Sequence, residues 1–263
     1  MLKKLLKYDL IWIYKFLIIF YSIAVFFAIL TRIFTAIGGS VMMTFLSEFC
    51  SGVTISMFIS AIINNLTRLW LRFSRNFYGD ESYLTHTLPI KKSTLFLSKA
   101  LTAFITVFSS VLVAVFACFI AYYSKENMQT LKNALFAFAN AYEISVFGLL
   151  IALVLLLYLE IATALMAGYL GTILGHRRNG SKTGLSVLFG FLVYMGVQTA
   201  VILVISTAGI FFPDLTAIYK PLATPSVGVL KALTAISIVT YSVLLAFVYF
   251  ISLKLFNRGV NVD

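Results

Sequence analysis

Six apolar stretches follow one another along this chain, and each exceeds the roughly 20 residues that a helix needs to cross a bilayer core. The stretch from Ala100 to Ser124, for example, contains no charged residue. Hydrophobic residues make up 61% of the 263 residues, which is more apolar surface than a soluble fold with one buried face per helix can hide. We therefore predict an all-α polytopic membrane protein with six transmembrane helices. Their expected bounds are Phe16–Ile37, Met43–Leu66, Leu95–Tyr123, Ile144–Leu174, Leu185–Ile210 and Val229–Phe256.

Three segments outside these helices have a composition of their own. Residues 1–15 combine leucine, isoleucine and tryptophan with four lysines, which is typical of an amphipathic helix lying on an anionic leaflet. Residues 67–94 contain the longest polar interruption of the chain. Residues 211–226 hold three of the four prolines, so we do not expect a continuous spanning helix there. Nothing marks off a soluble domain, and we treat residues 1–263 as a single transmembrane domain.

The distribution of basic residues predicts the orientation. Placing both termini in the cytoplasm puts most of the 20 Lys and Arg residues on the cytoplasmic side, as the positive-inside rule requires. The net charge of +11 is therefore explained by topology and by contact with membrane lipid, without a nucleic-acid partner. The basic residues left on the outer side are Arg32, Lys125, Lys132, Lys220 and Lys231.

The polar stretch Thr67–Lys99 is expected to begin as an extension of the second transmembrane helix. Arg68, Arg72 and Arg75 are spaced by four and three residues, so they share one face of that helix. Gly79 is expected to end it, because glycine is the residue most common just after a helix C-terminus.

A second, short helix is expected directly after this glycine. Asp80 and Glu81 supply a cap and negative charge for its N-terminus, Pro89 limits it to about two turns, and Ser93 is placed to cap the following helix. So short a helix, below the ~12–15 residues needed for marginal stability alone, must lean on its own protein, on the membrane surface or on a partner. The alternative is an ordinary cytoplasmic loop. The side chains on one side of the short helix are Tyr83, Leu84, Thr87 and Leu88.

Glu160 is the acidic residue deepest within a predicted span. An ionised carboxylate at the bilayer centre costs about 2.5–3.5 kcal/mol on insertion scales, so we expect it to face a cavity, a partner group or water. Two interpretations stay open: a substrate or proton site, or a protonated, hydrogen-bonded side chain that holds helices together. Later in the same helix, small residues at three- and four-residue spacing, including Gly168 and Gly171, suit close helix packing.

Motifs of a catalytic chain are lacking. The run Gly175–Thr183 resembles the phosphate-binding pattern GxxxxGK[ST], but an extra serine precedes the lysine and a membrane helix replaces the required strand. The sequence has no HExxH motif, and Cys50 and Cys118 both lie in apolar runs. We expect neither enzymatic activity nor a metal or cofactor in this chain.

The segment from Gly79 to Leu101 reads GDESYLTHTLPIKKSTLFLSKAL. It resembles the permease subunits of bacterial ABC-type exporters, and more narrowly the short six-helix permeases of the ABC type-2 (type V) class common in Gram-positive bacteria. The rest of the chain shares only the architecture of these proteins. The positions that carry the resemblance are Gly79, Asp80, Glu81, Tyr83, Leu84, Thr87, Leu88, Pro89, Ser98, Lys99 and Leu101.

The resemblance implies that the 67–94 loop carries a coupling helix, formed by Asp80 to Pro89, that docks on a dimer of a separate ATPase subunit. ATP and Mg would be bound by that partner. It also implies a second permease subunit, the same or homologous, a helical or re-entrant extracellular element at 211–226, and a place in the bacterial plasma membrane. The expected function is export of an amphipathic peptide, antibiotic or lipid. The alternatives are a secondary transporter or channel that uses Glu160 for ion or proton coupling, and a non-transporting immunity or sensor subunit.

Overall fold

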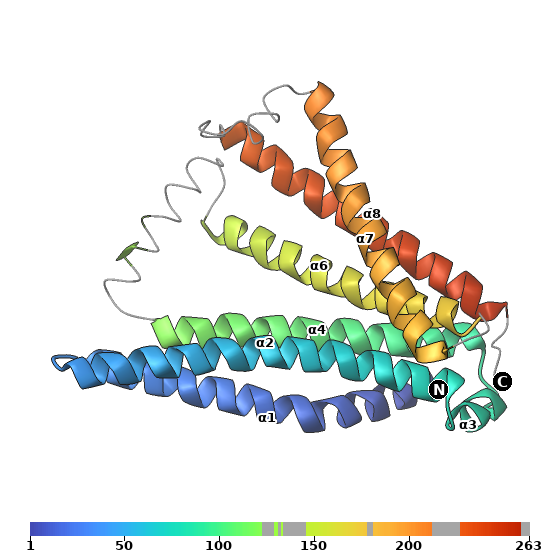
Figure 1. The fold of residues 1–263 in the computed structure, drawn as a ribbon, viewed down its shortest axis with the longest axis horizontal. Coiled ribbons are helices and arrows are strands. Elements are labelled where there is room, and N and C mark those ends of the chain that lie inside the picture. The colour runs from blue at the N-terminus through green and yellow to red at the C-terminus, as the bar shows by residue number, and fades with distance from the viewer. Residues whose placement is uncertain (123–128, 131–132, 134–145, 178–180, 212–226, 259–263) are drawn as a thin grey trace. The chain divides into compact units, whose positions relative to one another are not determined.

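The computed structural model describes residues 1–122, 129–130, 133, 146–177, 181–211 and 227–258 (Figure 1). Within these residues every regular element is an α-helix, and six of the helices are long and apolar enough to cross a membrane. The predicted all-α class and the six candidate spans are thereby confirmed. The helices are α1 (Leu2–Ile37), α2 (Val41–Tyr78), α3 (Ser82–Thr87), α4 (Lys92–Tyr122), α6 (Val146–Gly175), α7 (Lys182–Phe211) and α8 (Val227–Asn257), of which α3 is the short one.

The predicted interfacial helix over residues 1–15 is wrong as a separate element. α1 is one continuous helix of 36 residues, which at ~1.5 Å per residue is about 54 Å long. The buried stripe of this helix does not stop at Phe16, since Ile13 and Leu17 are both fully buried one turn apart. α1 also contains no glycine or proline at which it could bend sharply toward the membrane plane.

The end of α2 was predicted correctly, whereas the start of α4 was not. α2 continues past all three arginines and ends at Tyr78, directly before Gly79, as predicted. The predicted cap at Ser93 is wrong, because α4 begins at Lys92. The carbonyl of Lys91 accepts the first backbone hydrogen bonds of α4, so Ser93 lies inside the first turn. The predicted extracellular element at 211–226 lies outside the described residues except for Phe211, the last residue of α7.

Two compact units make up the chain. The first comprises residues 1–75 and 87–131, and the second comprises residues 76–86 and 132–263. α2 therefore contributes most of its length to the first unit and its last turn to the second.

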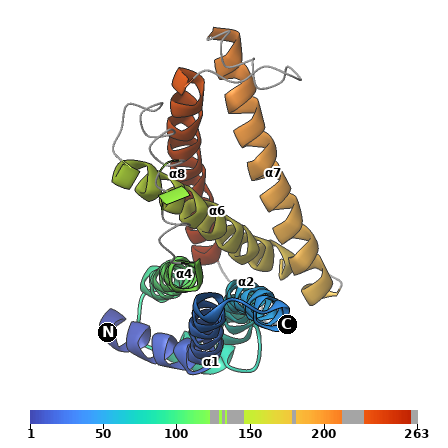
Figure 2. The ribbon, with the colours of Figure 1, turned by 90° about the vertical axis from the view of Figure 1, so that its left-hand side faces the viewer.

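In the first unit, α1 packs lengthwise against α4, and α2 lies beside them (Figures 1 and 2). Polar contacts tie the three helices together within the apolar span. The hydroxyl of Tyr14 on α1 donates to Ser109 Oγ on α4 at 2.9 Å, and Tyr21 Oη lies 2.7 Å from Ser110 Oγ. Asn65 on α2 donates to the same Ser110 Oγ at 3.2 Å. These hydrogen bonds fix the height of each helix relative to its neighbours.

A row of buried hydroxyl groups runs along α4. Ser98, Thr102, Thr106 and Ser110 are spaced by four residues and are all at most 3% exposed. Thr102 and Ser110 each donate to the carbonyl four residues earlier at 2.9 Å, so these hydroxyls are satisfied by their own helix. Hydroxyls satisfied in this way can be buried in a membrane protein without water, whereas Ser98 Oγ at the start of the row is buried with no hydrogen-bond partner among the described residues.

In the second unit, α6 packs against both α7 and α8. Leu159, Val201 and Tyr241, one from each helix, form its buried apolar cluster. The last turn of α2 also belongs to this unit. Phe77 contacts Phe256 of α8 edge-to-face, with ring centroids 4.7 Å apart.

Candidate docking helix and intramembrane polar sites

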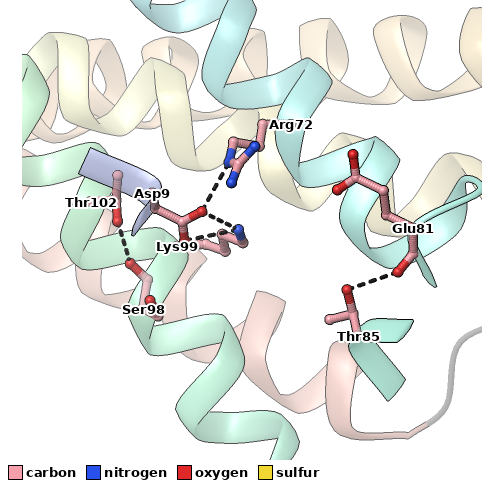
Figure 3. A network of polar contacts seen from close by, with 7 residues as sticks. All are labelled: Asp9, Arg72, Glu81, Thr85, Ser98, Lys99 and Thr102. Atoms are coloured by element: carbon pink, nitrogen blue, oxygen red, sulfur yellow. Dashed lines mark hydrogen bonds and ion pairs between the residues drawn. The ribbon is translucent and has the colours of Figure 1, made fainter. Parts of the chain in front are cut away.

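The short helix α3 forms where the sequence predicts it. Its chain turns at Gly79, whose carbonyl accepts a hydrogen bond from the Ser82 amide at 2.9 Å. Glu81 then occupies the N-cap position, because its carbonyl accepts hydrogen bonds from the Thr85 amide at 3.0 Å and from Thr85 Oγ1 at 2.9 Å (Figure 3). Asp80, the residue before the cap, is exposed.

One side of α3 is buried and the other presents apolar side chains to the outside. Ser82 is fully buried, whereas Tyr83 is 72% exposed and Leu84 is 75% exposed. Leu88, directly after the helix, is 42% exposed, and Thr87 and Pro89 are exposed as well. The structure therefore places the predicted site residues from Asp80 to Pro89 together on one short, outward-facing segment.

An aromatic and histidine contact fixes the base of this segment to α6. The ring of Tyr78 stacks on the ring of His176, with centroids 4.2 Å apart. Nδ1 of His176 lies 2.9 Å from the Thr172 carbonyl and 3.3 Å from Ser186 Oγ. Because a carbonyl can only accept, Nδ1 carries the proton in this arrangement.

The same surroundings favour the neutral form of the His176 ring. Burial lowers the pKa of His176, and the positive charge of Lys182 lowers it further, although the hydrogen bond to the Thr172 carbonyl acts in the opposite direction. His176 belongs to the contact that anchors the start of the α3 segment, and its protonation is disfavoured in the folded chain.

The first unit contains a buried ion cluster. Asp9 Oδ1 accepts hydrogen bonds from Arg72 Nε at 2.9 Å and from Lys99 Nζ at 2.8 Å, and Asp9 Oδ2 accepts from Lys99 Nζ at 2.8 Å (Figure 3). The side chain of Asp9 is 5% exposed. This cluster joins α1, α2 and α4, and its geometry serves to hold helices rather than to perform chemistry.

Sequence reasoning found the arginine face of α2 but not the cluster that it belongs to. Asp9 is the only acidic residue before Glu48, which was the one available signal. Its partners are 63 and 90 residues away, and no spacing rule connects them.

Aromatic rings of α1 cover the arginines of α2. The guanidinium of Arg72 lies 4.5 Å from the ring centroid of Trp12, and that of Arg68 lies 3.6 Å from the ring centroid of Phe16. Each pair is one helical turn from the other on both helices. Two arginines of the predicted face, Arg68 and Arg72, are therefore packed within the first unit, whereas Arg75 is exposed.

Glu160 is half-buried near the middle of α6. In the same unit, the hydroxyl of Tyr241 on α8 donates to Gln198 Oε1 of α7 at 3.0 Å. No ion pair joins Glu160 to any basic residue in the part of the chain that the structure describes. The same part contains no group of three or more His, Cys, Asp or Glu residues that could hold a metal ion.

Gly168 and Gly171 lie in the contact between α6 and α7, two and three turns after Glu160. A Cβ atom on Gly171 would overlap the backbone of Gly190 and would lie 2.7 Å from the carbonyl oxygen of Ser186. The Cα atom of Gly168 is 3.5 Å from the position of a Cβ on Gly190. These glycines are therefore packing residues, which the small-residue spacing indicated, and they do not form one site with Glu160.

Comparison of the chain with protein-family models, with curated proteins and with solved structures finds no match.

Proposed function

We propose that this chain is the membrane-spanning permease subunit of an ATP-driven ABC exporter, with both termini in the cytoplasm of a bacterial cell. The observation that carries the proposal is α3, a six-residue helix whose Tyr83 and Leu84 are 72% and 75% exposed. The resemblance of residues 79–101 to the coupling segment of such permeases supports it. In this proposal ATP and Mg are bound by a dimer of a separate ATPase subunit.

The exposed side of α3 has the properties of a small docking surface. Burying a leucine side chain is worth about 1.5–3 kcal/mol, so Leu84 and Leu88 could supply a large part of the energy of a small contact. Exposed singly, such residues are ordinary. Three of them together, Tyr83, Leu84 and Leu88, on and directly after a helix too short to be stable alone indicate a partner.

The anchoring of α3 suggests how force would reach the membrane helices. Phe77 and Tyr78 attach the start of the segment to α8 and to the end of α6 through Phe256 and His176. Closure of the paired ATPases would displace α3, and these aromatic contacts would pass the displacement to α6 and α8. A second permease subunit, the same or homologous, would provide the other wall of the substrate path.

The test places a photocrosslinking amino acid at Leu84 or Leu88 in cells that make the protein. We expect capture of a protein that carries a GxxxxGK[ST] sequence, and ATP hydrolysis by the complex purified with it. Leu84→Asp should reduce both the amount of ATPase recovered and its turnover, whereas Leu84→Met, which keeps an apolar side chain, should change neither.

Two outcomes would contradict the proposal. One is normal recovery and turnover with both Leu84→Asp and Leu88→Asp. The other is a cysteine at position 84 that reacts with an impermeant thiol reagent outside intact cells, since that would place α3 on the wrong side of the membrane. The native cysteines, Cys50 and Cys118, are replaced beforehand so that only the new thiol is measured.

A second candidate function rests on Glu160, a half-buried carboxylate in the middle of a membrane helix with no ion-pair partner among the described residues. Such a residue could couple transport to a proton or ion gradient. Transport in proteoliposomes driven by a proton gradient without ATP, and abolished by Glu160→Gln, would favour this candidate over the exporter.

A further inference from the structure

We infer that the first unit contains a binding site for the phosphate headgroup of an anionic phospholipid, formed by Arg68 of α2 beside Phe16 of α1. The inference goes beyond the proposed export function and does not depend on it, since it concerns how this unit is held at the membrane surface. Three observations carry it: the charge balance of the unit, the depth of Arg68 along α1 and the apolar surface next to it.

Positive charge is in excess at the end of the first unit that carries the ion cluster. Asp9 binds both Arg72 and Lys99, so one carboxylate serves two cations there (Figure 3). Arg68, one turn before Arg72 on α2, has no ion pair among the described residues. The described part of the first unit contains one further acidic residue, Glu48, which is 20 residues before Arg68 and therefore about 30 Å away along α2. These residues offer Arg68 no second carboxylate.

The guanidinium of Arg68 keeps donors to spare. It lies 3.6 Å from the ring centroid of Phe16, and its Nε is buried without a hydrogen-bond partner among the described residues. The two Nη atoms also form no hydrogen bond within that part of the chain, and they are not fully buried, so an acceptor can reach them. The forked donors of a guanidinium match the oxygens of a phosphate, and such charge-assisted hydrogen bonds are about twice as strong as neutral ones.

Arg68 lies at the depth of lipid headgroups. From Phe16 to Thr31, α1 contains no charged residue, whereas Lys15 directly precedes this stretch. The helix is about 54 Å long and the hydrocarbon core is ~30 Å thick, so the lysine-bearing start of α1 extends beyond the core. The ring of Phe16 therefore marks the boundary, and the phosphates of the adjoining leaflet are the anions within reach of Arg68.

An exposed apolar stripe begins at the same place and suits the acyl chain of the lipid. Phe16, Ile19 and Phe26 share one face of α1, and all three are exposed. A phospholipid uses both the stripe and the guanidinium, whereas a soluble phosphate would use only the guanidinium. Basic sites between membrane helices near the surface bind anionic headgroups in this way.

The test measures binding of phosphatidylglycerol to the full chain in detergent micelles by native mass spectrometry, with phosphatidylcholine as the lipid without net charge. Arg68→Gln removes a charge-assisted contact and should weaken phosphatidylglycerol binding about 10- to 100-fold. Arg68→Lys keeps the charge but not the fork, so its binding should lie between the two. Arg75→Gln removes the same charge from an exposed position two turns further along α2 and should bind like the unaltered protein.

Unchanged binding by Arg68→Gln would overturn the inference, and so would the same weakening in Arg75→Gln, which would show a response to net charge alone. Equal binding of phosphatidylcholine by the unaltered protein would overturn it too. Displacement of phosphatidylglycerol by inorganic phosphate would identify a site for soluble phosphate instead of lipid. If Arg68→Gln does not fold, a diazirine-bearing phosphatidylglycerol is used on the unaltered protein. Labelling must then fall near Phe16 and Arg68 and be displaced by phosphatidylglycerol but not by phosphatidylcholine, and any other pattern overturns the inference.

Discussion

Replacing Gly171 by alanine tests how tightly α6 and α7 are packed. The added Cβ would lie 2.7 Å from the Ser186 carbonyl oxygen, whereas ordinary van der Waals contacts begin at 3.4 Å, and it would overlap the Gly190 backbone more severely. Both obstacles are backbone atoms of a helix, so they cannot rotate away as a side chain would. The two helices must separate by about an ångström, and a gap of 0.5–1 Å forfeits roughly a quarter to a half of each dispersion contact.

The expected cost follows from two opposing terms. Overpacking of a tight contact costs about 1–3 kcal/mol, while alanine is a better helix former than glycine by up to about 1 kcal/mol. We therefore expect Gly171→Ala to lower the free energy of unfolding by about 1–2 kcal/mol. Unfolding is measured by titration with a denaturing detergent in bicelles, followed by circular dichroism.

Two matched glycines make the measurement specific. Gly196→Ala on α7 places its Cβ in open space, with no atom within 4 Å, so it should be neutral or slightly stabilising. Gly190→Ala should be tolerated, since its Cβ would be 3.5 Å from the nearest atom, an ordinary contact. Equal stability of the Gly171 and Gly196 variants would refute the reasoning that backbone contact at position 171 holds these helices together.

Two further predictions concern charge. The pKa of His176 is lowered in the folded state, so the unfolded chain binds more protons as pH falls below the ordinary value of about 6.5. The free energy of unfolding should therefore keep its full value above that pH and decrease below it. His176→Phe, which keeps a ring against Tyr78, should remove this pH dependence of the unfolding midpoint. Asp9→Asn removes the carboxylate that binds Lys99 and should lower the free energy of unfolding by about 3 kcal/mol in the same detergent titration; a loss below ~1 kcal/mol would show that the pair behaves as a surface ion pair.

Features that depend on local sequence were predictable. The number of spans followed from the length of the apolar runs, and the end of α2 followed from Gly79. α3 was expected from its position between Gly79 and Pro89, and the packing role of Gly171 from the spacing of small residues. In each case the residues that carry the signal lie within one or a few turns of one another in the sequence, even where, as at Gly171, the contact itself is with another helix.

Features that depend on the pairing of distant helices were not predictable. The contact of Asp9 with Lys99 requires knowledge of which helices are neighbours and at what height. The break expected near Phe16 was wrong because lysines and apolar residues alternate there in the same way on a surface helix and on a buried one. Only the burial of Ile13 and Leu17 against the rest of the first unit distinguishes the two cases.

The ion cluster of the first unit also imposes an order on biosynthesis. Asp9 leaves the ribosome before either of its partners, since Arg72 and Lys99 follow it 63 and 90 residues later. At translation rates of about 5–20 residues per second, roughly 5 to 18 s pass before Lys99 exists. During that interval the end of α1 that carries Asp9 lacks its ion cluster, and the helix is free to turn and shift in the membrane. The arrival of α4 ends this freedom, so a pause in translation before residue 99 would prolong the time in which α1 can be misplaced or degraded.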